Sequence, residues 1–248
     1  MENNELLKRA EDLCARCERT ASLTSTGFLT PAERYAMENW AKHRADCNLV
    51  FSGGRPECER TVAFFLPYYM EKEDFPAEEY IRAIELKAFF GAPGHRDYMG
   101  ALLGMGIGRE WLGDIWVMED KATIFCLPSV LRHLLSIEKV GRCGVKAREL
   151  ALDEIPAPER KVKQVSFSVM SMRLDAVAAG MFNLSRTEAA KQISAGNLSL
   201  NYSVTDKTDA PVHEGDILSL RGTGKGTVTG TGGRSRKDRI FVTAERRV

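Results

Sequence analysis

The chain has 248 residues, of which 44% are hydrophobic and 28% charged, a composition typical of soluble globular proteins. Its longest apolar run, residues 62–70, contains Pro67 and is less than half of the roughly 20 residues that a membrane-spanning helix needs, so we expect no membrane segment. The 35 Lys and Arg residues against 34 Asp and Glu residues give a net charge of +1, which argues against a strongly basic nucleic-acid binder. The acidic N-terminus is unlike a signal peptide, so we expect a cytoplasmic protein with reduced cysteines.

Residues 1–76 form the first predicted domain, and the pattern there is mainly helical. Thr30 followed by Pro31 is typical of a helix start, with an N-cap residue and then proline at the first helical position. A helical apolar stripe follows, formed by Tyr35, Met37, Trp40 and Ala41. The apolar run at residues 62–66 is compatible with one short strand.

Cys14 and Cys17 lie in an earlier amphipathic stretch of this domain with Cys-x-x-Cys spacing. Such a pair can supply half of a zinc site, but the sequence contains no second Cys-x-x-Cys and no His-x3-His partner. We therefore expect buried apolar thiols, with no metal and no cofactor.

Residues 77–155 form the second predicted domain, in which strand and helix patterns alternate. Strands are expected at 81–89, 114–118, 122–127 and 145–152, and helices at 96–103 and 128–137. The order β-α-β-β-α-β is that of the ferredoxin-like fold, which RNA-recognition modules share.

RNA binding in the manner of those modules needs aromatic side chains on the two central strands. Phe89, Phe90 and Phe125 are available, but residues 121–127 lack the basic-Gly-aromatic signature, so we expect all three rings in the core.

Glycines at 104, 106 and 108 resemble a nucleotide-binding loop. The dinucleotide motif follows a strand and opens a helix, whereas these glycines follow a helical run. We therefore expect them to end that helix and turn the chain into the next element.

The charge balance changes at a proline-containing linker, residues 155–159. Residues 161–248 contain 14 Lys and Arg against 8 Asp and Glu, a net charge of +6, and residues 1–160 contain 21 against 26, a net charge of −5. The C-terminal domain, residues 164–248, is therefore basic enough for a nucleic-acid partner. The acidic part is a candidate surface for a protein partner.

Two helices and a small sheet are expected in the C-terminal domain. Residues 174–182 present one apolar helical face, and residues 185–188 have the capping-box pattern that starts a second helix. Strands are expected at 198–204 and 217–221. The glycine-rich segment from Gly222 does not fit the loop Gly-x4-Gly-Lys-[Ser/Thr], and we expect a mobile hairpin loop there.

Several fixed spacings in this domain resemble the S4 RNA-binding domain. They are Arg173-Leu174-Asp175, Ser185-Arg186-x-x-Ala189, Ile193-x-x-Gly196-x-Leu198-x-Leu200-Asn201, and Glu214-Gly215-Asp216-Ile217 with Arg221-Gly222. The resemblance implies an S4-like α+β fold that binds structured RNA with the basic edge of its two helices. The RNA-binding residues implied are Arg173, Ser185, Arg186, Lys191 and Asn201.

Cations of the tail extend this candidate footprint, since Lys and Arg neutralise phosphates and release counterions. They are Arg221, Lys225, Arg234, Arg236, Lys237 and Arg239. A basic chain end can equally be a solvated tail, so both interpretations stay open for these residues.

The chain upstream of this domain resembles the YlmH family of bacterial and plastid S4 proteins. The matching residues are His95-Arg96-Asp97-Tyr98-Met99-Gly100-Ala101-Leu102-Leu103-Gly104 and Arg109-Glu110-x-x-Gly113-Asp114-Ile115, with looser matches at Phe28-Leu29-x-Pro31 and Phe51-x-Gly53-Gly54-x-x-Glu57-x-Glu59-Arg60. The resemblance implies a non-catalytic RNA-binding protein associated with rRNA and tRNA on the large ribosomal subunit, in rescue or quality control of stalled translation. A role in cell division has also been linked to the family.

One enzyme remains as an alternative. Arg173-Leu174-Asp175 also resembles the catalytic triplet of pseudouridine synthases, whose Asp is the nucleophile. A Thr-Ser-Gly stretch follows the triplet in those enzymes, whereas an amphipathic helix follows it here. We therefore expect Asp175 to be structural, as the partner of a nearby arginine, and RNA modification stays the second hypothesis.

Overall fold

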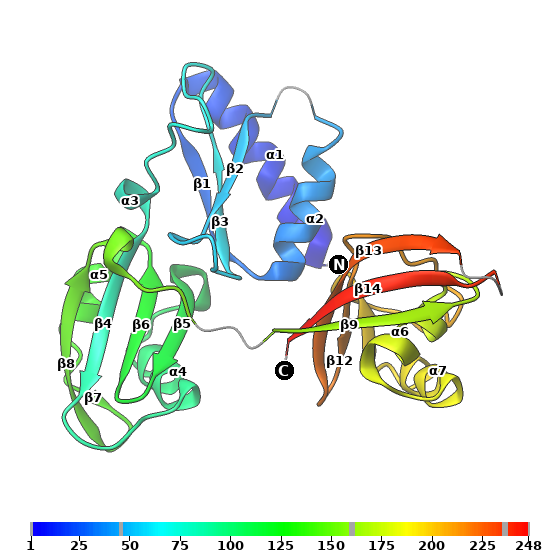
Figure 1. The fold of residues 1–248 in the computed structure, drawn as a ribbon. Helices are drawn as coiled ribbons and strands as arrows, with labels where there is room; N and C mark the ends of the chain where they lie inside the picture. The colour runs from blue at the N-terminus through cyan, green and yellow to red at the C-terminus, as the bar shows by residue number, and fades with distance from the viewer. Residues whose placement is uncertain (1, 45–46, 159–161, 235–237, 248) are drawn as a thin grey trace. The chain divides into compact units, whose positions relative to one another are not determined.

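The computed structural model describes residues 2–44, 47–158, 162–234 and 238–247, which form two compact units (Figure 1). Unit 1 is Met1–Pro158 and unit 2 is Glu159–Val248. Both units combine helices with antiparallel sheets, which confirms the α+β class. The three-domain boundaries expected from the sequence stay a prediction. Across the described ranges, no helix combines the length and apolar character that crossing a membrane requires.

The N-terminal part of unit 1 packs α1 (Glu2–Thr20) and α2 (Pro31–Ala41) on one face of a three-stranded sheet. The strands are β1 (Thr24–Leu29), β2 (Leu49–Ser52) and β3 (Thr61–Phe65), in the order β1-β3-β2. The sequence predicts only β3, because β1 is rich in Thr, Ser and Gly and β2 is short. The helices form as expected, and α2 begins with the predicted cap at Thr30, but the region also contains a sheet that a mainly helical description omits.

The two cysteines of α1 are buried, as predicted. Cys14 and Cys17 are 5% and 3% exposed, and the Cys17 thiol donates to the carbonyl oxygen of Phe65 at 3.2 Å. Burial raises the pKa of the Cys17 thiol. No group of three or more His, Cys, Asp and Glu side chains that could hold a metal ion occurs in the described part of the chain.

The second sheet of unit 1 has the predicted β-α-β-β-α-β order. Its elements are β4 (Arg82–Ala88), α4 (His95–Gly104), β5 (Leu112–Met118), β6 (Lys121–Cys126), α5 (Pro128–Leu135) and β8 (Cys143–Leu150), with a short β7 (Lys139–Val140) at one edge. The strand order β5-β6-β4-β8-β7, with every neighbouring pair antiparallel, is the ferredoxin-like arrangement. Gly106, with φ +77°, turns the chain just after α4 ends, as expected.

Short helical turns fill the remaining connections of unit 1. They are α3 (Ala77–Tyr80), η1 (Arg109–Trp111) and η2 (Leu152–Glu154).

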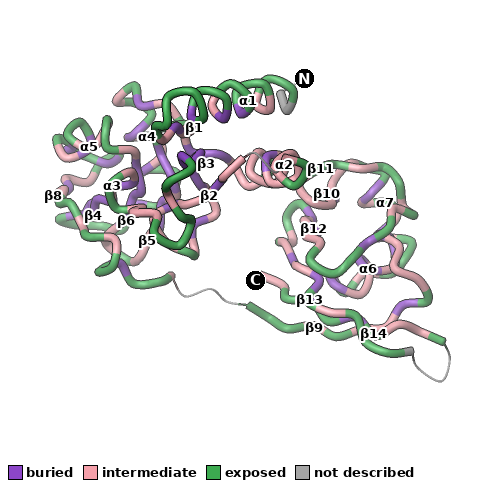
Figure 2. The backbone as a smooth tube through the Cα atoms, turned by 90° about the horizontal axis from the view of Figure 1, so that it is seen from above, coloured by how far each residue is buried: buried purple, intermediate pink, exposed green. Residues whose placement is uncertain are grey.

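Strand β3 is buried on both faces and joins two cores (Figure 2). Ala63 and Phe65 pack with the helices α1 and α2, while Val62 and Phe64 pack with residues of the second sheet. Among the latter are Phe125, which is fully buried, and Trp116, which is 9% exposed. One end of the open face of the ferredoxin-like sheet is therefore covered by the N-terminal part.

A partly buried polar contact connects the same two parts. The Asp114 carboxylate accepts from the backbone N–H groups of Glu59 at 2.7 Å and Arg60 at 3.0 Å. The Arg60 guanidinium donates to the carbonyl oxygens of Phe28 and Arg109, each at 2.9 Å, and burial lowers the pKa of Arg60. The residues with which the chain resembles the YlmH family thus meet in space, although they are about 50 positions apart in the sequence.

The prediction that three phenylalanines lie in the core is right for Phe125 and wrong for Phe89 and Phe90. These two rings are 70% and 62% exposed. Strand β4 ends at Ala88, and the chain bends there, so both rings lie beyond the part of the sheet that other elements cover.

Unit 2 places two helices on one face of a six-stranded sheet (Figure 1). The elements are β9 (Val162–Val169), α6 (Leu174–Phe182), α7 (Arg186–Ser194), β10 (Leu198–Leu200), β11 (Ser203–Val204), β12 (Ile217–Leu220), β13 (Gly224–Arg234) and β14 (Ile240–Arg247). The order is β11-β10-β12-β13-β14-β9. The predicted apolar face of α6 is buried, at Leu174, Val177, Ala178, Met181 and Phe182.

Two expectations for unit 2 are wrong. Residues 198–204 form a hairpin rather than one strand, because Asn201 and Tyr202 both have positive φ, +48° and +66°, as in a type I′ turn. The glycine-rich segment makes a tight hairpin turn at residues 221–223, but from Gly224 on it is the paired strand β13 rather than a mobile loop. At Gly226 a Cβ would lie 2.6 Å from the Met181 sulfur, so the absence of a side chain lets this strand approach α6.

Candidate RNA-binding surface

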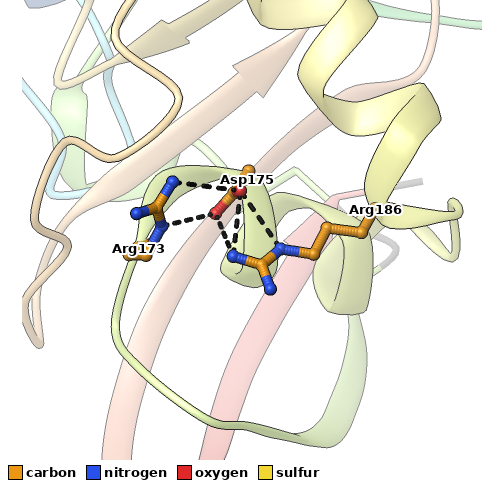
Figure 3. Close-up of polar contacts among 3 residues, drawn as sticks. All are labelled: Arg173, Asp175 and Arg186. Atoms are coloured by element: carbon orange, nitrogen blue, oxygen red, sulfur yellow. Dashed lines mark hydrogen bonds and ion pairs between the residues drawn. The ribbon is translucent and has the colours of Figure 1, made fainter.

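One buried carboxylate organises the start of both helices in unit 2. Asp175, in the first turn of α6, is 6% exposed, and its backbone N–H donates to the carbonyl of Thr208. Two arginines converge on its side chain from different elements (Figure 3). Arg173, the N-cap residue of α6, donates from Nε at 3.3 Å, and Arg186, the first residue of α7, donates from Nε at 3.1 Å and from Nη2 at 3.3 Å. Asp175 is thus the arginine partner that the sequence predicts.

Local sequence sets the position of α7 relative to α6. Asn183 ends α6 in the left-handed conformation, with φ +56°, and reverses the chain. Ser185 then caps α7 by accepting from the backbone N–H of Glu188 at 3.1 Å, as predicted. Ala189 and Ile193 bury the inner side of α7, which leaves Lys191 exposed on the outer side.

Arg173 and Arg186 are positioned by Asp175 but remain accessible to a ligand. Their side chains are 40% exposed for Arg173 and 57% for Arg186, although both contact Asp175. A guanidinium has five N–H donors, so one carboxylate leaves part of each fork free to bind an anion. The backbone N–H groups at the start of α7 add a favourable field for a phosphate beside Arg186.

The structure brings together only part of the predicted set. Arg173, Ser185, Arg186 and Lys191 lie on the helix layer, and we name these four the helix surface. Arg221 is exposed and follows β12, where its backbone N–H donates to the carbonyl of Asn197, just past the end of α7.

Two other predicted residues do not join the helix surface. Asn201 is half-buried, and its amide is engaged in the fold, donating to Asp216 at 2.7 Å and accepting from the N–H of Ile217 at 2.9 Å. Lys225 follows the alternation of β13, in which Gly226 faces α6, so the Lys225 side chain points to the opposite face of the sheet.

The tail cations are partly structural. Arg239 donates from Nε to the Ser168 hydroxyl at 3.0 Å. Arg236 and Lys237 lie outside the described residues.

Comparison with known proteins tests the resemblance to the YlmH family that the sequence suggests. A family model described as "Putative RNA-binding domain in YlmH" matches residues 71–154, which include the whole ferredoxin-like sheet. The "Ribosome-associated protein quality control protein P2" of Bacillus subtilis (strain 168) is 31% identical over 222 residues, covering 89% of this chain and 86% of that protein.

The chain belongs to the YlmH family. Its fold agrees with this assignment, since the "Cell division protein ylmH from Streptococcus pneumoniae" matches with a TM-score of 0.55, at 21% identity, over 62% of this chain and 94% of that one. The resemblance seen in the sequence is therefore confirmed for the YlmH family.

Unit 1 contains a further group of cations that no motif in the sequence marks. Lys87, Lys121, Lys139, Lys146 and Arg148 are spread over about 60 residues on four strands. The strand alternation marks each as outward-facing, but only the pairing register shows that they are neighbours.

Proposed function

We propose that this YlmH-family protein binds structured RNA through the helix surface, extended by Arg221. The observation that carries the proposal is the pair of partly exposed arginines held by the buried carboxylate of Asp175. Arginine forks fixed in this way match the geometry of phosphate oxygens, and Lys191 adds a charge on the same layer. Of the tail cations, Lys225 would act on a different face of unit 2 from the helix surface.

The RNA is proposed to be ribosomal RNA or tRNA on the large ribosomal subunit, met in the cytoplasm during quality control of stalled translation. The Bacillus subtilis relative, whose name describes it as ribosome-associated, supports this proposal. The RNA-binding family model matches residues 71–154 in unit 1, so it supports RNA binding by the chain but not by the helix surface in particular. Neither a catalytic step nor a cofactor is part of it.

RNA modification is the alternative function, and the surroundings of Asp175 count against it. A nucleophilic carboxylate has to reach a nucleotide, whereas the Asp175 side chain is only 9% exposed and accepts hydrogen bonds from two arginines. Mass spectrometry of RNA incubated with the full chain tests this alternative: a modified nucleotide would establish catalysis.

A protein partner for the acidic part of the chain is proposed as a compatible role. Residues 1–160 carry a net charge of −5, which suits a basic partner. Pull-downs with an R186Q/K191Q chain would separate partners held through RNA from those held by unit 1 directly.

The decisive experiment measures RNA binding by the full chain across a salt series. An R186Q/K191Q variant is compared with K163Q/K207Q, which removes two exposed cations of unit 2 outside the helix surface. We expect R186Q/K191Q to weaken binding of a structured ribosomal RNA fragment by about tenfold or more and to make the salt slope shallower by about 1–2. The control should bind nearly as the natural chain does. Equal binding by both variants, with the fold retained, would refute the helix surface, and no binding by the natural chain would refute the function.

A further inference from the structure

Three lysines form a row across the open face of the ferredoxin-like sheet. The pairing register puts Lys121 of β6 directly opposite Lys87 of β4, and Lys146 of β8 directly opposite Lys87 on its other side. Neighbouring strands are about 5 Å apart, so the three side chains start close together. All three point away from α4 and α5, because the residues that alternate with them lie in the core beneath those helices.

This row works against the stability of the fold. Like charges directly opposite each other on neighbouring strands are destabilising. Within the described residues, the only carboxylate in an ion pair with Lys87 is Asp120, at 3.8 Å, and Lys146 has no ion pair. Lys87 and Lys146 therefore gain little from the fold in return for this repulsion, which is expected where an anion binds.

The next row of the sheet orients two of the cations. Glu85, with its side chain 8% exposed, accepts from Lys121 at 3.1 Å and from Arg148 at 2.8 Å. The Arg148 side chain is 62% exposed, so most of it remains open to solvent. This face carries five cations, Lys87, Lys121, Lys139, Lys146 and Arg148, against the two carboxylates that pair with them, Glu85 and Asp120. The excess is positive, although unit 1 is acidic overall.

An exposed aromatic ring lies on the same face, next to the lysine row. A Cβ at Gly144 would lie 3.0 Å from the Phe89 ring, and Gly144 alternates with Lys146 on β8, so the Phe89 ring lies over the strand on the side of the lysines. Lys139 of β7 pairs with Gly144 and flanks this ring. The Phe89 side chain is largely exposed, with Phe90, also exposed, beside it.

We propose that these residues, Lys87, Lys121, Lys139, Lys146, Arg148 and Phe89, form a second RNA site, the sheet platform, which binds a single-stranded segment. Its cations would neutralise phosphates, and Phe89 would stack on an unpaired base. This inference rests on the proposed function, and it adds a specific site and a single-stranded ligand to the domain that the family model describes as a putative RNA-binding domain.

The combination of cations and ring favours RNA over an acidic protein. An acidic peptide would supply charge to the lysines but no planar base for the exposed ring. Single-stranded RNA supplies both, because its bases are free to stack on aromatic side chains. Stacking here would differ from that of RNA-recognition modules, whose aromatics occupy the central strands, since the outward positions of β4 and β6 next to the lysine row hold Glu85 and Thr123.

The test uses the full chain with a single-stranded oligouridine and a structured ribosomal RNA fragment. The K87Q/K146Q variant should lose about tenfold or more in oligouridine affinity, with a salt slope shallower by about 1–2. F89A should lose about tenfold without a change in the salt slope. The matched control, K8Q/K72Q, removes two exposed lysines of unit 1 away from the platform and should bind as the natural chain does.

The thermal midpoint of K87Q/K146Q shows whether this variant is folded. Because the substitutions relieve repulsion between like charges, we expect the midpoint to stay the same or rise. Unchanged oligouridine binding by K87Q/K146Q would overturn the platform, while loss of structured-RNA binding in R186Q/K191Q would leave the proposed function standing. Polyglutamate binding as tight as oligouridine binding, and unaffected by F89A, would also overturn it and assign the face to an acidic protein. If the natural chain bound neither RNA, the platform would fall together with the proposed function.

Discussion

Replacing Asp175 with Asn separates the charge of the helix surface from its geometry. The substitution removes one negative charge and raises the net charge of unit 2 by one. If charge alone determined RNA affinity, D175N would bind RNA more tightly. If Asp175 matters because it fixes Arg173 and Arg186, D175N should bind structured RNA more weakly, so the two explanations predict opposite signs.

The cost to stability follows from the contacts. Hydrogen bonds to a charged group are worth about 1.5–3 kcal/mol when shielded from water, and exposed ion pairs contribute about 1 kcal/mol or less. Asp175 is buried, but Arg173 and Arg186 are 40% and 57% exposed, which places each pair toward the lower value. Since Asn keeps one acceptor oxygen, we expect D175N to lower the free energy of unfolding by about 1–2 kcal/mol.

Two measurements decide the outcome. Urea unfolding is followed by far-ultraviolet circular dichroism, because all three tryptophans, Trp40, Trp111 and Trp116, lie in unit 1 and do not report on α6 and α7. Binding is measured for a structured RNA and for oligouridine, with D206N as the control that removes an exposed carboxylate of the same unit. We expect D175N to lose about threefold to tenfold in affinity for structured RNA relative to D206N. Affinity equal to or tighter than that of D206N, in a folded protein, would refute the positioning role.

Other substitutions test the packing and the charges elsewhere. D114A should lower the free energy of unfolding by about 1–3 kcal/mol, because two partly buried N–H donors lose their acceptor; an unchanged urea midpoint by tryptophan fluorescence would contradict this. The hydrogen bond from Arg148 holds the pKa of Glu85 below its ordinary 4.5, so this carboxylate stabilises the fold above that pH and ceases to do so as the pH falls through the lowered pKa. E85Q should therefore be less stable than the natural chain at neutral pH, with a difference that narrows on acidification below about pH 4.5; a pH-independent difference would count against it. G226A should cost about 1–3 kcal/mol by overpacking against Met181, measured as a lower thermal midpoint.

The elements that the sequence predicted well are those with a strong local signal. The strands and helices of the ferredoxin-like sheet and the capped helix α7 follow from alternation, Pro128 and Ser185, all of which act within a few residues. The hairpin at Asn201 was missed because alternation continues through Tyr202, and the turn depends on the contact between Asn201 and Asp216, 15 positions away. A contact between residues so far apart cannot be predicted from the sequence before the strand pairing is known.

The candidate site also contains residues that local sequence marks and residues that only strand pairing brings together. Arg173 and Arg186 were found because fixed spacings within the S4-like segment mark them, and their meeting on Asp175 could be anticipated from two adjacent helices. The lysine row could not, because the positions of Lys87, Lys121 and Lys146 acquire meaning only from the register of three strands. A shift of one residue in either pairing would move a lysine to the opposite face of the sheet.

The N-terminal part explains why a ferredoxin-like fold need not imply the RNA binding of RNA-recognition modules. One end of the open sheet face, with Phe125 and Trp116, is covered by β1 and β3, and the Asp114 contacts fasten that cover. The aromatics of the central part are therefore core residues, and only the far end of the face is open to a ligand. That open end carries several cations and few exposed rings, so any RNA bound there would be held mainly through its backbone.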